Sequence, residues 1–123
     1  MADRVESYRD LLVWQRGMDL AADVYELTKA WPRAEIYGLT SQVRRSAASI
    51  PANIAEGYGR ASSASYAQFL KIARGSLKEL ETHLLLAERV GIASKGCCAA
   101  IPRQADELGK MLGALIRKID AKS

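Results

Sequence analysis

The chain has 123 residues, a formal net charge of +4, and 49% hydrophobic, 26% charged and 7% aromatic residues. This length supports one domain, residues 1–123 with a core at about 8–119, and leaves no room for a second. No apolar run approaches the roughly 20 residues that span a bilayer, and the N-terminus lacks the apolar stretch of a signal peptide. We therefore expect no membrane association and a cytoplasmic location.

The first predicted helix covers about residues 10–30, and the step before Pro32 ends it because a residue preceding proline disfavours helical geometry. Two adjoining apolar stripes give this helix a wide apolar face. One stripe holds Trp14, Met18, Ala21, Tyr25 and Thr28, and the other holds Leu20, Val24, Leu27 and Trp31.

The second predicted helix, about residues 39–58, contains a proline in an otherwise helical apolar pattern. Pro51 cannot donate to the carbonyl of Ala47, so we expect a kink there. The hydroxyls of Ser46 and Ser49 are placed to satisfy backbone groups that the proline frees. In the motif that follows, Asn53 and Glu56 lie three residues apart, so their side chains are close enough to interact across one helical turn.

Pro51, Asn53, Glu56 and Gly57 have two interpretations. They set the geometry between the second and third helices and a subunit contact, which is the reading we favour, or they bind a ligand directly.

The third helix is predicted over about 63–90, with serine as a possible N-cap and Gly91 as its stop signal. The fourth is predicted from about Ser94, with Pro102 near its start, and carries a near-heptad apolar seam. The small pair Gly75 and Ser76 suggests a close helix approach. Four helices with short connections predict an all-α, up-and-down four-helix bundle.

Cys97 and Cys98 are adjacent, so a disulfide between them would be strained, and no zinc or redox spacing exists. We expect both to pack in the core as free thiols, which fits a reducing compartment.

The run Gln42–Arg60, QVRRSAASIPANIAEGYGR, and the run Phe69–Glu81, FLKIARGSLKELE, resemble the four-helix-bundle family encoded by intervening sequences of bacterial 23S rRNA genes. The resemblance covers about Tyr8–Ile119. The chain is also similar to the accessory proteins of diversity-generating retroelements, small basic bundles that associate with a reverse transcriptase and nucleic acid. Both families form homopentamers, so the resemblance implies a pentamer, and we expect a ring-like homo-oligomer.

Positive charge is concentrated in residues 41–78, a segment that contains six cations and a single acid, Glu56. The six are Arg44, Arg45, Arg60, Lys71, Arg74 and Lys78. The last three are spaced to share one exposed helix face. This segment predicts a surface that binds RNA or DNA through backbone phosphates.

Three alternatives stay open for these residues. The cations form an ordinary solvated face, or they dock an acidic protein such as a reverse transcriptase. In the third alternative, Arg44 and Arg45 pair with Glu56, or with acids such as Glu79 and Glu81 between helices or subunits, instead of with phosphate. Tyr58 and Tyr66, which flank Arg60, stack on bases or pack internally.

Enzyme chemistry has little support in the sequence. His83 is the sole histidine, no nucleophile constellation surrounds it, and the acids lack the repeated Glu-x-x-His pattern of a di-iron bundle. We expect no catalytic residues, no metal and no cofactor. The apolar faces of the first helix, with Trp14 and Trp31, and of the fourth helix predict self-association.

Overall fold

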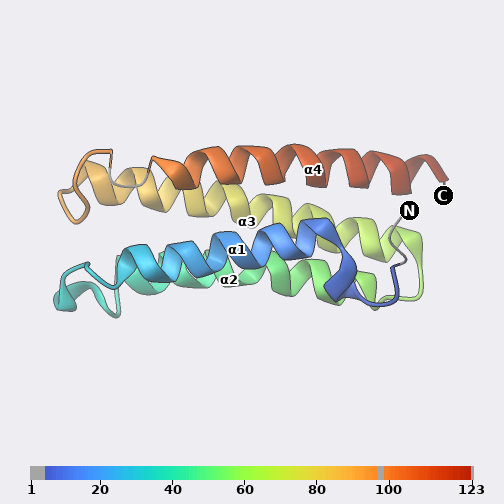
Figure 1. Ribbon diagram of the computed structural model, residues 1–123, viewed down its shortest axis with the longest axis horizontal. Coiled ribbons are helices and arrows are strands. Elements are labelled where there is room, and N and C mark those ends of the chain that lie inside the picture. The colour runs from blue at the N-terminus through green and yellow to red at the C-terminus, as the bar shows by residue number, and fades with distance from the viewer. Residues whose placement is uncertain (1–4, 97–98, 123) are drawn as a thin grey trace.

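The computed structural model describes residues 5–96 and 99–122, and its described residues form helices and no strands. The four α-helices of Figure 1 confirm the predicted all-α bundle. The elements in order are η1 (Tyr8–Asp10), α1 (Leu12–Thr28), η2 (Arg33–Glu35), α2 (Leu39–Tyr58), α3 (Ser63–Arg89) and α4 (Ala100–Lys122).

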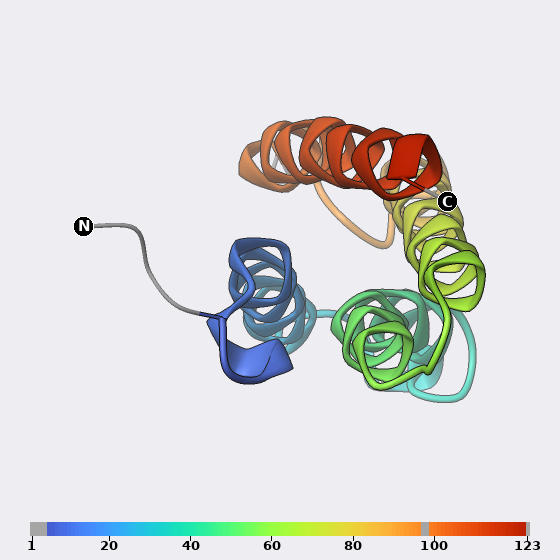
Figure 2. The ribbon, with the colours of Figure 1, turned by 90° about the vertical axis from the view of Figure 1, so that its right-hand side faces the viewer.

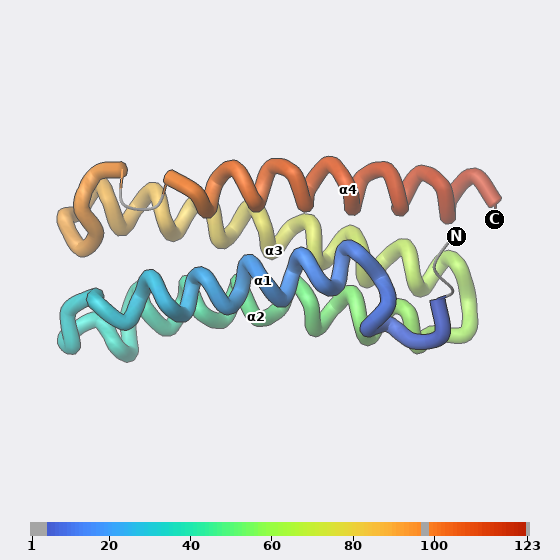
Figure 3. The backbone as a smooth tube through the Cα atoms, in the orientation of Figure 1, coloured from blue at the N-terminus to red at the C-terminus, as the bar shows by residue number. Residues whose placement is uncertain are grey.

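The helices run up and down along one long axis, so that each is antiparallel to the next (Figure 3). Viewed along that axis they surround a common core in chain order, α1 beside α2, α2 beside α3, and α3 beside α4 (Figure 2). The α2–α3 contact is the most extensive, and the α1–α4 contact that closes the bundle is the lightest.

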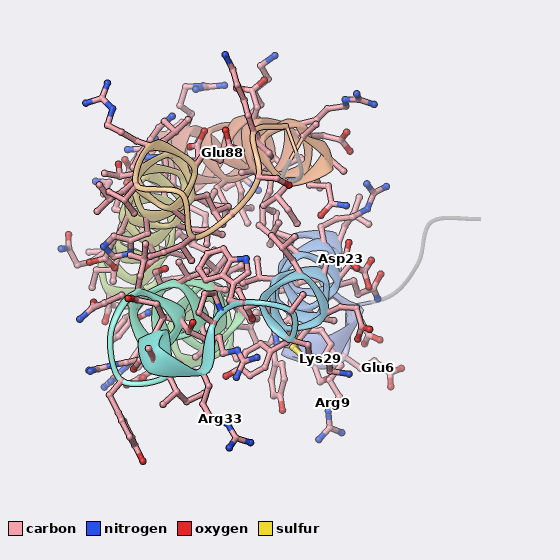
Figure 4. All side chains as sticks on the ribbon, turned by 90° about the vertical axis from the view of Figure 1, so that its left-hand side faces the viewer. Glu6, Arg9, Asp23, Lys29, Arg33 and Glu88 are labelled. Carbon is pink, nitrogen blue, oxygen red and sulfur yellow. The ribbon has the colours of Figure 1, made fainter. Side chains whose placement is uncertain are left out.

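Polar side chains bridge the α1–α4 seam. Arg16 Nη1 lies 2.8 Å from Glu107 Oε1. Asp23 lies on the side of α1 turned toward α4 (Figure 4), where its Oδ2 accepts a hydrogen bond from Gln104 Nε2 at 2.9 Å. This seam is therefore closed by surface groups as well as by the core beneath it.

The core separates the two predicted apolar stripes of α1. Met18 and Tyr25, from the stripe that also holds Trp14, are 45% and 44% exposed. The buried stripe of α1 instead includes Val13 and Gly17. Its full set is Val13, Gly17, Leu20, Val24 and Thr28.

The predicted helix boundaries hold well except at the two ends of the first helix and the start of the fourth. Residues 8–10 form a separate 3-10 turn, η1, closed by a capping box in which Ser7 accepts from Arg9 N and Asp10 accepts from Ser7 N. The fourth helix begins at Ala100, not near Ser94. The intervening loop holds Gly91 and Gly96 at φ of 80° and 84°, values that interrupt a right-handed helix.

Pro102 lies in the first turn of α4, where its missing N–H costs no intrahelical bond. The expectation for Cys97 and Cys98 falls outside the described residues.

Pro51 is buried within α2, and the helix continues across it without a break. The Ser46 hydroxyl donates to the carbonyl of Val43 at 3.0 Å, and the Ser49 hydroxyl lies 3.1 Å from the carbonyl of Ser46. These serines therefore bond carbonyls that precede Ala47 in the chain. They do not bond the carbonyl of Ala47, to which Pro51 cannot donate. The bend itself stays a prediction.

Candidate nucleic-acid interface

The three predicted cations of α3 lie along its exposed edge beside α4, and two of them pair with carboxylates. Lys71 Nζ is 3.6 Å from Asp120 Oδ2 on α4, and Lys78 Nζ is 3.4 Å from Glu81 Oε1 one turn ahead. Both lysines are exposed. Exposed pairs of this kind contribute about 0–1 kcal/mol, so a phosphate can replace either carboxylate at little cost.

Arg74 faces another arginine. Its Nη1 lies 3.8 Å from the point where a Cβ on Gly113 would stand, and Arg117 Nη1 lies 3.3 Å from the same point. The two nitrogen atoms are therefore no farther apart than the sum of those distances, about 7 Å. Among the residues that the structure describes, neither guanidinium has an ion-pair partner.

This pairing is unfavourable in the isolated protein. Two positive charges about 7 Å apart repel by about 0.6 kcal/mol in bulk water, and by about 2 kcal/mol at an effective dielectric constant of about 20. The repulsion becomes attraction for any anion that lies between them.

Arg74 and Arg117 belong to a groove between α3 and α4 with a volume of about 320 Å³. At Gly109 and Gly113 its α4 wall carries no side chain, and a Cβ on Gly109 would stand 3.8 Å from Leu77 Cδ1. The groove is lined by Arg74, Leu77, Lys78, Glu81, Ala105, Asp106, Gly109, Lys110, Gly113 and Arg117. Four cations against two carboxylates leave this lining with a net charge of +2.

Lys110 and Arg117 were not among the predicted site residues. The charge count along the chain stopped at residue 78, and it is the packing of α4 against α3 that brings these cations to the same groove. Their spacing of seven, with Gly109 and Gly113 on the same side of the helix, is the sequence signal that marks them.

Arg60 does not join this groove. It pairs with Glu56, Nη2 to Oε2 at 2.6 Å, and its guanidinium carbon lies 4.7 Å from the centre of the Phe69 ring. A salt bridge and a cation–π contact therefore hold Arg60 at the connection between α2 and α3. It remains partly exposed but is separate from the α3–α4 edge.

Arg44 links α1 to α2. Its Nε donates to Thr28 Oγ1 at 2.8 Å, and its guanidinium carbon lies 4.9 Å from the centre of the Tyr25 ring. Within the described protomer a hydroxyl and an aromatic face hold Arg44, and its alternative pairing with Glu56, Glu79 or Glu81 is not among the ion pairs of the described residues. Arg45 is exposed and forms no ion pair within the described part of the chain.

The motif around Pro51 makes structural contacts. Asn53 Nδ2 donates back to the carbonyl of Ser49 at 2.7 Å, while Glu56 pairs forward with Arg60. The expected contact between Asn53 and Glu56 is thus absent from the described interactions.

α2 and α3 make close contacts at Gly57 and at Ser76. A Cβ on Gly57 would stand 2.7 Å from Phe69 Cβ, too close for two carbon atoms. The hydroxyls of Ser49 and Ser76 lie 2.5 Å apart across the helices. Gly75 was expected to permit a close approach but has no atom within 4 Å of its Cβ position.

Tyr58 and Tyr66 pack against each other, edge to face, with ring centres 6.0 Å apart. Both are half-buried. Burial, and secondarily the neighbouring Tyr58, raises the pKa of Tyr66 above its ordinary value. These contacts support internal packing over base stacking.

The described residues hold no group of three or more histidine, cysteine, aspartate or glutamate side chains able to bind a metal ion. The buried Nδ1 of His83 has no hydrogen-bond partner in the described part of the chain. No described helix combines the length and apolar character required to cross a membrane.

Three comparisons place this fold among known proteins. The model of a family described as 23S rRNA-intervening sequence protein matches residues 9–114. No curated protein matches the chain. The chain is similar to the crystal structure of a protein with unknown function from the S23 ribosomal protein family of Bacteroides thetaiotaomicron VPI-5482, with 25% identity and a TM-score of 0.75, over 85% of this chain and 98% of that one.

Proposed function

Since the chain belongs to the 23S rRNA-intervening sequence protein family, we propose that it is a non-enzymatic, oligomeric bundle of the cytoplasm that binds RNA or DNA through a cationic surface. The observation that carries the proposal is the α3–α4 edge, where cations of both helices line one groove. Lys71 extends the same edge by one turn, through its contact with Asp120.

A phosphate backbone suits this surface better than a base-reading mode does. The groove lining holds no aromatic side chain on which a base would stack. Lysine and arginine bind phosphates largely without regard to sequence and release counterions from the nucleic acid, which makes the affinity depend steeply on salt. We therefore expect sequence-independent, salt-sensitive binding.

The test is fluorescence anisotropy with a labelled structured RNA and a labelled DNA duplex across a salt series. Reversing the charge of Lys71, Lys78 and Lys110 to glutamate should abolish binding at physiological salt. The matched control reverses three exposed cations at the α1–α2 side, Arg9, Lys29 and Arg33, which point away from the bundle (Figure 4). Circular dichroism checks that both variants keep their helices.

If the two triple variants lose affinity equally, the assignment of binding to the α3–α4 edge fails. If the wild-type protein binds neither nucleic acid at low salt, the whole proposal fails, and the alternative is a scaffold that docks an acidic protein, such as a reverse transcriptase. Leu85, Leu86 and Val90 favour that alternative: they are 66%, 44% and 57% exposed near the end of α3, and a protein partner would cover such apolar side chains.

The oligomer is part of the same proposal. Two apolar surfaces expected to contact another subunit, Trp31 and the apolar face of α4, are instead buried within the protomer. Trp31 is buried in the protomer's own core, and so are Ile101, Ala105, Leu108 and Leu112 of the α4 seam. These side chains are not available to another subunit.

A groove between α1 and α2 remains available for the subunit contact. Met18 and the partly buried Trp14 line it from α1, opposite a row of small residues on α2. Its lining is Tyr8, Trp14, Met18, Ala21, Ala48, Pro51, Ala52 and Ala55. We expect this apolar groove to be covered in a homo-oligomer, for which the family resemblance implies five copies.

A further inference from the structure

We propose that Arg74 and Arg117 hold one phosphate group between them, with Gly113 leaving room for it, and that the ligand is a backbone phosphate of RNA or DNA. This inference rests on the proposed function and names the point of contact. It assigns a binding role to Arg117 and Gly113.

The register between α3 and α4 is the first observation. Lys71 of α3 contacts Asp120 of α4, an ordinary pair of opposite charges. Three residues farther along α3 and three residues back along α4, the antiparallel arrangement brings Arg74 opposite Arg117. One turn therefore pairs a cation with an acid across the two helices, and the next turn places two cations opposite each other.

The acids of the groove do not compensate these arginines. Asp106 Oδ2 lies 3.3 Å from Lys110 Nζ, and Glu81 Oε1 lies 3.4 Å from Lys78 Nζ, so each carboxylate already has a lysine. One part of the groove is thus neutralised, whereas the part around Gly113 carries two guanidiniums and no paired carboxylate among the described residues.

The spacing fits a tetrahedral oxyanion. Charge-assisted hydrogen bonds from guanidinium to phosphate measure about 2.7–2.9 Å. With the two Nη1 atoms at most about 7 Å apart, a single phosphate accepts a bond from each arginine through two different oxygens. Gly113 contributes by what it lacks, because a methyl group there would stand 3.3 Å from Arg117 Nη1.

The experiment compares Arg74→Gln, Arg117→Gln and the double variant with the wild type, by anisotropy on a labelled RNA duplex across a salt series. Arg103→Gln is the matched control, since it removes the same charge from an exposed position of α4 outside the groove. Each groove variant should lose about tenfold in affinity. Because both arginines hold one phosphate, the double variant should lose far less than the product of the two.

The salt dependence separates one shared phosphate from two independent ones. The slope of log affinity against log salt should fall by about one in the double variant, whereas two separate phosphate contacts predict a fall of about two. A fall of two, or losses no greater than in Arg103→Gln, would overturn the shared site while leaving nucleic-acid binding intact.

A second variant tests the geometry without changing charge. Gly113→Ala keeps both arginines and adds a methyl group 3.3 Å from Arg117 Nη1, where it would crowd the proposed phosphate, so it should weaken RNA binding severalfold. Gly75→Ala, with no atom near its Cβ position, is the control and should bind as the wild type does. Equal binding by both variants contradicts the proposal.

Two further measurements cover the remaining outcomes. If the wild type binds no nucleic acid, the melting temperature in inorganic phosphate is compared with that in chloride at equal ionic strength. A rise that Arg117→Gln abolishes assigns the groove to free phosphate, and no rise overturns the site. A drop in oligomer mass in either arginine variant shows that a carboxylate of a neighbouring copy fills the gap, which also overturns it.

Discussion

At the scale of single residues, the arginines show how strongly the surroundings decide the role of one side chain. Arg44 donates to a hydroxyl on α1, Arg60 pairs with Glu56, and Arg74 faces Arg117. All three belong to the same basic segment of sequence. Of these three, only Arg74 lies opposite a second cation, and it is therefore the strongest member of the predicted site.

Gly57 is the residue at which one added methyl group should cost most. In Gly57→Ala the new Cβ would stand 2.7 Å from Phe69 Cβ, so α2 and α3 must separate. We expect a loss of about 1–3 kcal/mol in the free energy of unfolding, measured by chemical denaturation at fixed protein concentration.

Gly59→Ala is the control for Gly57→Ala. Its nearest neighbour is the carbonyl oxygen of Glu56 at 3.6 Å, an ordinary contact, and its φ of −79° suits any residue. Equal stability of the two variants would show that α3 does not depend on the close approach at Gly57.

At the scale of elements, α2 and α3 show how a sequence feature can be recognised while its purpose is misjudged. The pattern through Pro51 predicted one helix over about residues 39–58 with a kink at the proline; the structure has the helix over Leu39–Tyr58, and the kink stays a prediction. The small pair in α3 predicted a close approach, which holds for Ser76 but not for Gly75. Small size alone does not tell whether a residue faces a neighbouring helix or open space.

Gly75→Ala should therefore stabilise α3. The position is exposed within the helix, and its Cβ would meet no atom within 4 Å. Alanine reduces the backbone entropy of the unfolded chain, so we expect a gain of about 0.5–1 kcal/mol. Thermal or chemical denaturation measures it. A loss of stability would indicate that a second copy of the chain packs on this face.

At the scale of the whole molecule, the exposed apolar groove between α1 and α2 governs the expected assembly. Light scattering at micromolar concentration should give a mass several times 13.4 kDa, and five times that value if the family resemblance holds. Ala52→Glu should lower the mass, because it places a charge in the groove that another subunit covers.

Ala114→Glu is the matched control, since this exposed alanine of α4 lies outside the groove. A clean monomer of 13.4 kDa for the wild type would contradict the assembly. So would equal effects of the two substitutions.

The sequence by itself determined the four helices, most of their boundaries and the family. Helical periodicity, N-caps and glycine stops act through neighbours three or four residues apart, and such local signals can be read along the chain. Tertiary structure alone decided which cations lie opposite a carboxylate and which lie opposite another cation. The opposition of Arg74 and Arg117 depends on the register between two helices far apart in sequence, and that register follows from how all four helices share one core.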